Sequence, residues 1–366
     1  MPTPTPYTNL WDTRRSLGVM RAIQQEDWYF QQFYTNELRS TEAWIDFEKL
    51  PILKRKLAPL VMPKARGRGV WEDSQRSYRF KPGYLKVEET IDDDMPLTFQ
   101  PGMGSVFDMN QMTDMQRLDA IRATMLATMD NSIERRWEWM RARAIIDGKV
   151  TLKYDSGEEF LVDFQRNAAH TIALGSGSRF GDSGVSIIDF IQTQVDRMNN
   201  AEFGGFVRRV TMSTAVARIV RADASILKHL DLFTKGGTIT VERGIVSGAA
   251  NGGKTYKFGE IMVGGASGVT IELWVNDEVY LADDGTVTRY LGANQMLFTA
   301  DPSQIMGYQC FGKIVDRDAQ YQALPKFPKN YIETNGDITT EYLNIKSAPL
   351  MVPINPDATL VATVIA

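Results

Sequence analysis

The sequence predicts an α+β protein, and three observations carry that prediction. A single very long amphipathic helix is expected over residues 114–147. Short strands punctuated by turn signals surround it, most clearly in the C-terminal hairpin around Asn335-Gly336. Residues 185–300 mix helix and strand patterns, as in a compact insertion. At 366 residues the chain can bury a substantial core, and its length suggests two or three domains.

The composition excludes several classes of protein. No run of about 18 apolar residues occurs, so no membrane-spanning helix is expected. The N-terminus lacks the apolar core of a signal peptide. Cys310 is the only cysteine, so no disulfide can form within the chain, which fits a reducing cytoplasm. The net charge of −4 argues against tight binding to nucleic-acid phosphates.

The sequence contains no constellation of catalytic or metal-binding residues. His170 and His229 are the only histidines, and neither has a second histidine or a cysteine at ligand spacing. The run Asp92–Asp94 could attract a hard cation, but alternate side chains of an extended chain point apart, so a solvated acidic turn is favoured. We therefore expect no enzyme activity, no catalytic residues, no cofactor and no bound metal.

Residues 1–50 are expected to form an N-terminal arm. The first residues are rich in proline and threonine, which favours an extended chain. Aromatic residues then crowd the segment, namely Trp28, Tyr29, Phe30, Phe33, Tyr34, Trp44 and Phe47. Such side chains must be buried, either in their own subunit or against a neighbour, and the sequence leaves both possibilities open.

Residues 51–106 lack helical periodicity and suggest a long two-stranded excursion with a basic half and an acidic half. An isolated hairpin is marginally stable, so contact with a neighbouring subunit is expected. The candidate contact residues are Arg66, Arg68, Trp71, Tyr78, Phe80, Tyr84, Glu88 and Glu89. Basic and aromatic residues together could also bind single-stranded nucleic acid, but the acidic residues nearby favour protein–protein contact.

The long helix has a clear beginning, end and apolar face. Thr113 and Gln116 form the sequence pattern of a capping box, and Gly148 is a suitable C-terminal stop. The expected core stripe recurs at steps of three or four residues and comprises Leu118, Ile121, Met125, Met129, Ile133, Trp137 and Met140. Charged residues such as Glu138 and Arg141 are expected on the polar side. The stripe lacks a strict heptad, which argues against a coiled coil.

The remaining chain alternates between strands and helices. Residues 150–154 and 160–164 are expected to form a hairpin, and the loop at 175–178 lacks a phosphate-binding pattern. Residues 185–300 are expected to form the α/β insertion, after which the chain returns to the first domain as strands.

Four sequence motifs resemble, in order, those of the lambda-type major capsid protein E family of tailed phages. Phe80–Lys86 is similar to the family's Phe-x-Pro-Gly-Tyr-hydrophobic-Lys, and Val162–Arg166 to its Val-Asp-hydrophobic-Gly-Arg, with Gln165 in place of glycine. Asp316–Gln320 resembles Asp-x-Asp-Ala-Gln. The fourth motif lies in two parts, Phe327–Tyr331 and Ser347–Met351. These motifs extend from residue 80 nearly to the C-terminus.

The resemblance implies a Hong Kong 97-like phage capsid fold. Residues 1–50 would be the N-terminal arm, 51–106 the E-loop, 107–184 the P-domain with its spine helix, 185–300 the A-domain, and 301–366 the return to the P-domain with the C-terminal strands. The E-loop of that family lies over the adjacent subunit. A long arm, a long loop and a rigid spine suit a subunit that must meet several neighbours.

The function implied is that of a major capsid protein. Pentamers and hexamers of the chain would form the icosahedral head shell around the double-stranded DNA of a tailed phage, after assembly in the host bacterial cytoplasm. Expected partners are further copies of the chain, a separate scaffolding protein, the portal, in some phages a decoration protein, and DNA enclosed with weak non-specific contact. An encapsulin-like cellular compartment is the nearest alternative. A nucleic-acid-binding protein and a metal-dependent hydrolase are more remote.

Overall fold

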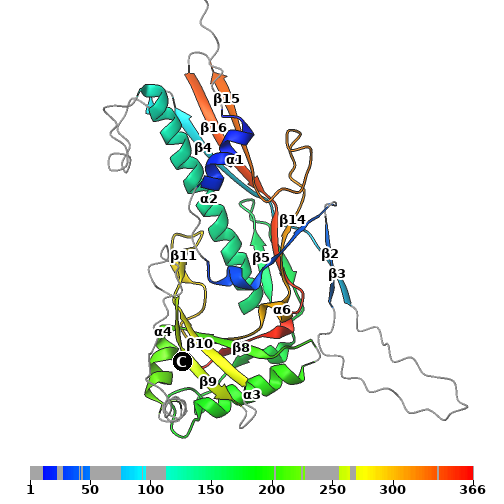
Figure 1. The fold of residues 1–366 in the computed structure, drawn as a ribbon, viewed down its shortest axis with the longest axis vertical. Coiled ribbons are helices and arrows are strands. Elements are labelled where there is room, and N and C mark those ends of the chain that lie inside the picture. The colour runs from blue at the N-terminus through cyan, green and yellow to red at the C-terminus, as the bar shows by residue number, and fades with distance from the viewer. Residues whose placement is uncertain are drawn as a thin grey trace, which may run out of the picture.

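The computed structural model describes residues 11–22, 28–40, 42, 44–49, 76–92, 94–95, 113–201, 203–223, 226, 255–263, 269–335 and 338–365. The molecule is elongated, with one long helix running from one end toward its middle and a mixed sheet with helices at the other end (Figure 1). Sheets and ribbons of two or three strands flank the helix.

The long helix α2 spans Asp114–Ile146. Its first turn is closed by the expected capping box, in which the Thr113 side chain accepts from the Gln116 N–H and the Gln116 side chain accepts from the Thr113 N–H. Gly148 follows the C-cap at a φ of +67°, a left-handed conformation that glycine adopts without strain. At 33 residues the helix is about 50 Å long.

Two three-stranded sheets pack along α2. In the first, β15 (Phe327–Asn335), β16 (Ile338–Ser347) and β4 (Leu85–Asp92) are antiparallel neighbours in that order. Helix α1 (Thr13–Ala22) packs against β15 and α2. In the second sheet, β14 (Gly307–Phe311) lies between β1 (Asn36–Arg39), which is parallel to it, and β17 (Pro349–Pro353), which is antiparallel.

Three two-stranded ribbons complete this part of the molecule. Strands β5 (Lys149–Lys153) and β6 (Glu159–Asp163) form the hairpin expected after the helix. Strand β11 (Val279–Leu281) pairs with β12 (Val287–Arg289). Strand β2 (Ile45–Lys49) pairs with β3 (Arg76–Phe80) and projects from the edge of the molecule (Figure 1).

The acidic strand of the expected two-stranded excursion lies elsewhere. Residues 85–92 form β4, which pairs along its whole length with β16 of the same subunit. The two-stranded ribbon in this region is therefore β2–β3, whose first strand precedes residue 51, and residues 85–92 do not belong to the expected two-stranded excursion. The cause is that β4 gains eight registered partners on β16 and a buried Ile91, which an isolated hairpin could not supply.

The other end of the molecule is a six-stranded mixed sheet covered by two helices. Its order is β7 (Thr171–Ala173), β18 (Thr359–Thr363), β13 (Gln295–Ala300), β8 (Val207–Met212), β10 (Val269–Asn276) and β9 (Thr255–Val263). Helices α3 (Ile187–Asn200) and α4 (Thr214–Ala222) pack against it. Short helical turns lie at η1 (Phe30–Phe33), η4 (Ala168–His170), α6 (Pro302–Ile305) and η7 (Pro356–Ala358).

Two of these strands come from segments expected in the first domain. Strand β18, near the C-terminus, inserts between β7 and β13 and is buried. Residues 171–173 and the last strand thus pair into the sheet built mainly by residues 185–300, while the division of the chain into domains stays a prediction. Sequence order cannot show this, because the pairing joins strands far apart in the chain.

Candidate assembly site

The four family-like motifs meet at one place beside the base of the β2–β3 ribbon. Phe80 packs edge-to-face on Phe164, with ring centroids 5.5 Å apart. Gly83 is buried so closely that an added Cβ would stand 3.3 Å from a Leu152 methyl and 3.7 Å from the Pro349 carbonyl oxygen. The first motif therefore contacts the second and the fourth, although more than 260 residues separate its glycine from Pro349.

A buried carboxylate joins the third motif to the fourth. The Asp316 side chain is 4% exposed and forms ion pairs with Lys329, at 3.1 Å, and Lys346, at 2.5 Å. Its Oδ1 also accepts from the Asp318 N–H. Burial alone would raise the pKa of Asp316, but these hydrogen bonds outweigh it and lower the pKa to about 2. Asp316 thus stays ionised and holds the loop at 312–326 against β15 and β16.

Two further contacts connect this loop to its surroundings. Burial raises the pKa of Tyr84, while a hydrogen bond with the backbone of Val315 opposes that rise. The Ser347 hydroxyl donates to the Pro325 carbonyl at 2.6 Å. The 312–326 loop is therefore connected to the segment that precedes β4 and to the end of β16.

The glycine position of the second motif carries backbone strain in this chain. Gln165 has a φ of +52°, in the left-handed region where a side chain is disfavoured. Its N–H donates to Asp163 Oδ1 at 2.7 Å, which stabilises the turn. This conformation explains physically why glycine suits the position.

The structure places the eight loop candidates in three groups. Arg66, Arg68 and Trp71 lie outside the described residues, and of Tyr78 only the backbone, within β3, is described. Phe80 and Tyr84 are half-buried at the motif junction. Glu88 and Glu89 lie on β4, where Glu88 contacts Lys86, Asn344 and Tyr331 of its own subunit. The hydrogen bond from Lys86 is the main cause that lowers the pKa of Glu88.

The expected stripe of α2 faces the interior. Leu118, Ile121, Met129, Ile133, Trp137 and Met140 are buried, and Met125 is partly buried against the same core. Trp137 packs on Phe311 of β14, with centroids 5.1 Å apart, and the Lys326 ammonium lies over its ring.

The helix also buries charged residues that were expected on a solvated polar side. Arg122, Glu138 and Arg141 are each at most 1% exposed. Arg122 forms hydrogen bonds with Glu341 of β16, and Arg141 pairs with Glu138 at 3.2 Å. Periodicity missed these residues because α2 is enclosed on more than one side, so its charged residues are satisfied by partners rather than by water.

The arm segment 28–34 packs between α2 and the six-stranded sheet. Tyr29, Phe30, Phe33 and Tyr34 are buried in their own subunit, which answers the question that the sequence left open for these four. The Phe30 N–H donates to Glu138 Oε1 at 2.6 Å. On the other side, the Tyr29 hydroxyl contacts Thr211 Oγ1 at 2.5 Å.

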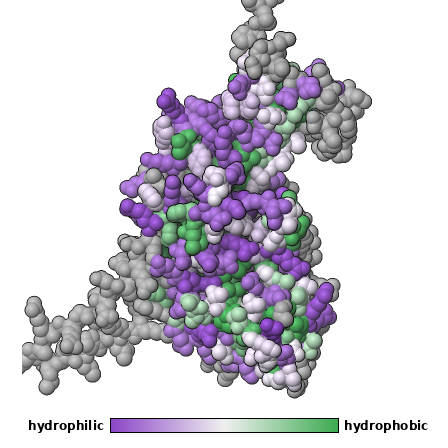
Figure 2. Space-filling model, turned by 180° about the vertical axis from the view of Figure 1, so that it is seen from behind, coloured by the Kyte–Doolittle hydropathy of each residue, from purple (hydrophilic) through white to green (hydrophobic). Residues whose placement is uncertain are grey.

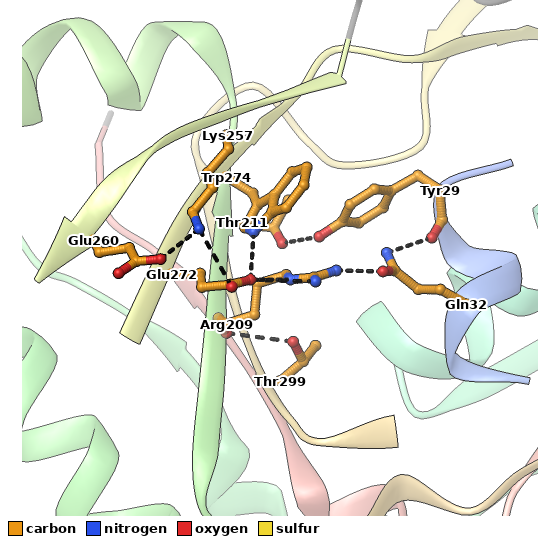
Figure 3. Close-up of polar contacts among 9 residues, drawn as sticks. All are labelled: Tyr29, Gln32, Arg209, Thr211, Lys257, Glu260, Glu272, Trp274 and Thr299. Carbon is orange, nitrogen blue, oxygen red and sulfur yellow. Dashed lines mark hydrogen bonds and ion pairs between the residues drawn. The ribbon is translucent and has the colours of Figure 1, made fainter. Parts of the chain in front are cut away.

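A polar network fixes the arm to the sheet (Figure 3). Arg209 of β8 bonds to Gln32 of the arm, pairs with Glu272 at 3.3 Å and lies over the Trp274 ring at 4.5 Å. Lys257 also pairs with Glu272, at 3.4 Å. Burial raises the pKa of Glu272, but the Trp274 hydrogen bond and the two cations outweigh burial and lower it overall. No sequence motif marked these residues, because their partners are distant in the chain.

The histidine, the cysteine and the potential metal-ligand side chains of the described residues have ordinary structural surroundings. Among them no group of three or more metal-ligand side chains occurs. His170 is buried, its Nδ1 lies 3.2 Å from the Thr359 carbonyl, and burial lowers its pKa. Burial raises the pKa of the Cys310 thiol. Within the described part of the chain, no helix is long and apolar enough to cross a membrane.

Comparison with known proteins identifies the fold and the family. The model of the family described as phage major capsid protein E matches residues 19–364. The chain is 26% identical over 362 residues to the major capsid protein of Enterobacteria phage P21, covering 97% of this chain and 99% of the relative. It is 23% identical over 335 residues to the major capsid protein of Escherichia phage lambda, covering 90% and 91%.

A solved structure has the same fold as this chain. A crystal structure assigned to a prophage capsid protein of Escherichia coli CFT073 superposes with a TM-score of 0.68 at 18% identity, covering 97% of this chain and 99% of that one. That likeness confirms the expected Hong Kong 97-like capsid fold. Because the family model spans nearly the whole sequence, the chain belongs to the phage major capsid protein E family.

Proposed function

We propose that this chain is the major capsid protein of a tailed phage and that it assembles, through pentamers and hexamers, into the icosahedral shell around double-stranded DNA. The observation that carries the proposal is the family match over residues 19–364. The family has a structural role, which confirms the expectation that the chain is not an enzyme.

The geometry supports assembly through several modest contacts. The β2–β3 ribbon projects from the part of the molecule built around helix α2 (Figure 1). Apolar side chains on the visible face form small separate patches among hydrophilic ones (Figure 2). Several weak contacts acting together hold a subunit firmly, because each contact raises the effective concentration of the next.

The ribbon and the residues between its strands are proposed to reach a neighbouring subunit. Strand β4 is not part of the proposed contact, because it is paired within its own subunit. Arg66, Arg68 and Trp71 remain the proposed contact residues. The support is that a two-stranded ribbon has too little core to stand alone.

The finer partners follow from the family alone. They are a separate scaffolding protein, the portal, in some phages a decoration protein, and DNA held with weak non-specific contact. Assembly in the host cytoplasm belongs to the same set of proposals.

Electron microscopy of the purified protein, with and without a scaffolding protein, tests the function. Uniform closed shells or rings of five and six subunits are expected. A protein that stays monomeric under both conditions would show that the proposal is wrong. Shells that contain enzymes instead of DNA would favour an encapsulin-like compartment, whereas tight, salt-sensitive DNA binding by free subunits would favour a nucleic-acid-binding protein.

A further inference from the structure

A lysine and two carboxylates are buried together between helix α2 and the start of β15. The Asp130 and Glu134 side chains lie one turn apart on the same face of α2. The Lys326 amine reaches both, at 2.5 Å from Asp130 Oδ1 and 2.6 Å from Glu134 Oε1. The Asp130 side chain is 2% exposed, and the other two are each 11% exposed. One amine therefore contacts two carboxylates in a place that little water reaches.

The position of the Lys326 amine is fixed from several sides. Lys326 directly precedes β15, whose first residue Phe327 is buried. On its other side the Pro325 carbonyl accepts from the Ser347 hydroxyl at 2.6 Å. The amine itself lies 4.9 Å from the centroid of the Trp137 ring. Groups of one chain that are held in contact in this way react as if each were present at a very high concentration.

The Asp130 carboxyl has the properties of a group that an amine can attack. Burial raises its pKa, Lys326 opposes that rise, and Glu134 adds to it. A raised pKa favours the neutral acid, whose carbonyl carbon is a much better electrophile than that of a carboxylate. The contact between Nζ and Oδ1 lacks the angles of a hydrogen bond, so this buried oxygen accepts none among the described residues. Such an oxygen is uncommon in folded proteins and indicates strain or chemistry at the site.

Another buried pair shows how an ordinary ion pair of this chain differs. Asp316 Oδ2 also lies 2.5 Å from a lysine amine, that of Lys346. Burial opposes ionisation there too, but hydrogen bonds from two lysines and from the Asp318 N–H lower the pKa of Asp316 to about 2. Asp316 is therefore a fully hydrogen-bonded carboxylate, which an amine does not attack. Asp130 differs in both its hydrogen bonding and the direction of its pKa shift.

We propose that Lys326 and Asp130 of the same chain become joined by an isopeptide bond, with Glu134 as the base and acid of the reaction. The inference goes beyond the proposed function, because the bond forms within one folded subunit and needs no second copy. It connects α2 covalently to the segment that enters β15. The two carboxylates then no longer compete for one buried cation.

The reaction is a condensation that releases one water molecule. Glu134 takes one proton from the Lys326 ammonium, and the freed lone pair forms the Nζ–Cγ bond with the protonated Asp130 carboxyl. A second nitrogen proton passes through Glu134 to the departing hydroxyl as the Cγ–O bond breaks. The last nitrogen proton stays as the amide N–H, and Glu134 ends protonated. No oxidant, reductant or cofactor takes part.

Mass spectrometry of the denatured, full-length wild-type chain, after storage of the folded protein, tests the bond. We expect an intact mass that is lower than that of the sequence by one water molecule. Tryptic digestion should give a branched peptide that joins residues 123–135 to residues 318–329, because trypsin does not cleave after a bonded Lys326. A chain with the full mass, or a loss of water located elsewhere, would refute the proposal.

Two substitutions separate a chemical role from a structural one. Lys326→Arg keeps a cation between the carboxylates but cannot form the bond, so its mass should be that of its sequence. Glu134→Gln keeps both partners of the bond and removes the base, so at equal age its bonded fraction should be at least about tenfold lower. A bonded fraction equal to that of the wild type would contradict the role assigned to Glu134. Lys329→Arg is the matched control, because Lys329 also pairs with two carboxylates, and it should still lose one water.

Denaturing gel electrophoresis gives an independent readout. A covalent connection between residues 130 and 326 keeps the unfolded chain more compact, so the wild type should migrate faster than Lys326→Arg after boiling in detergent. Equal migration of the two chains, without the branched peptide, would overturn the inference and leave the proposed function standing. A bonded chain that never forms shells or rings would overturn the function and support the bond.

Discussion

At the scale of single residues, buried ionisable side chains connect segments that lie far apart in the sequence. Glu138 of α2 is fully buried where the arm packs on the helix, and burial raises its pKa to about 7. Arg141 and the Phe30 N–H oppose that rise, while the nearby Glu278 adds to it. The arm is therefore attached to the spine through a carboxyl group that titrates near neutral pH.

This raised pKa predicts that subunit stability falls as pH rises from about 4.5 to about 7. In that window the folded state keeps a proton on Glu138, whereas the unfolded chain releases it. The unfolded state therefore binds fewer protons, and the free energy of unfolding falls as the pH rises. Glu138→Gln should remove on the order of 1–3 kcal/mol of this pH dependence. Thermal unfolding of soluble subunits at pH 5 and pH 8 measures it. Glu158→Gln, at an exposed carboxylate, is the control, and parallel pH profiles for Glu138→Gln and wild type would contradict the prediction.

The left-handed Gln165 provides a second residue-scale prediction. Glycine adopts a positive φ without the steric strain that Gln165 carries, and this gain should offset most of the extra conformational entropy that a glycine loses on folding. Gln165→Gly should therefore leave the free energy of unfolding unchanged or slightly increased. Gln165→Val adds a branched side chain in the same conformation and should cost about 1–2 kcal/mol. Urea unfolding of the two variants decides the matter. A large loss of stability in Gln165→Gly would show that its side chain, rather than the backbone, determines the turn.

The sequence pointed to the unusual position of Gln165 but not to the burial of Glu138. The motif comparison singled out Gln165, because one glycine in a local pattern had been replaced. Nothing local marked Glu138, whose partner Phe30 is 108 residues away. Its burial depends on the arm packing over α2, which no pattern along the helix reveals.

At the scale of elements, local signals were reliable where an element stabilises itself. The caps of α2 predicted its bounds, since capping depends on residues within one turn. The hairpin β5–β6 followed from its turn in the same way. Strand β4 was correctly expected as a strand, but its pairing with β16 was not foreseen, because that pairing depends on packing between distant segments.

Two tryptophans two residues apart on α2 test how the helix is oriented. Trp137 is 4% exposed and contacts Phe311, so Trp137→Ala should cost about 3–5 kcal/mol and yield mostly insoluble protein. Trp139 lies about 200° further round the helix, where it is half-buried and covered by Arg136. Trp139→Ala should be milder. Soluble yield and thermal unfolding measure both, and equal losses would mean that the two rings contribute alike.

At the scale of the whole molecule, chain order and spatial order differ. The six-stranded sheet takes β7 and β18 from segments on either side of the expected insertion, and the arm lies between that sheet and α2. The N-terminal arm and the C-terminal strand β18 each connect the six-stranded sheet to the part built around α2. We therefore expect these two parts to move as one body in the free subunit. Differences in conformation between neighbouring subunits are then expected mainly in the β2–β3 ribbon.

The segment between β2 and β3, which lies outside the described residues, yields the last prediction, which concerns assembly and not folding. Arg66→Glu together with Arg68→Glu reverses charge in the segment between β2 and β3, which is proposed to contact a neighbour. We expect shell yield to fall by about tenfold or more, because each like-charge pairing at an interface costs several-fold in affinity. The free energy of unfolding of the free subunit, measured by thermal unfolding, should stay within about 0.5 kcal/mol of the wild-type value, as for most surface substitutions. Lys153→Glu with Arg179→Glu makes the same change of charge within the described residues and serves as the control. If both double variants assemble like the wild type, the loop does not make the charged contact proposed for it; if Arg66→Glu/Arg68→Glu instead destabilises the free subunit, those arginines act within their own chain.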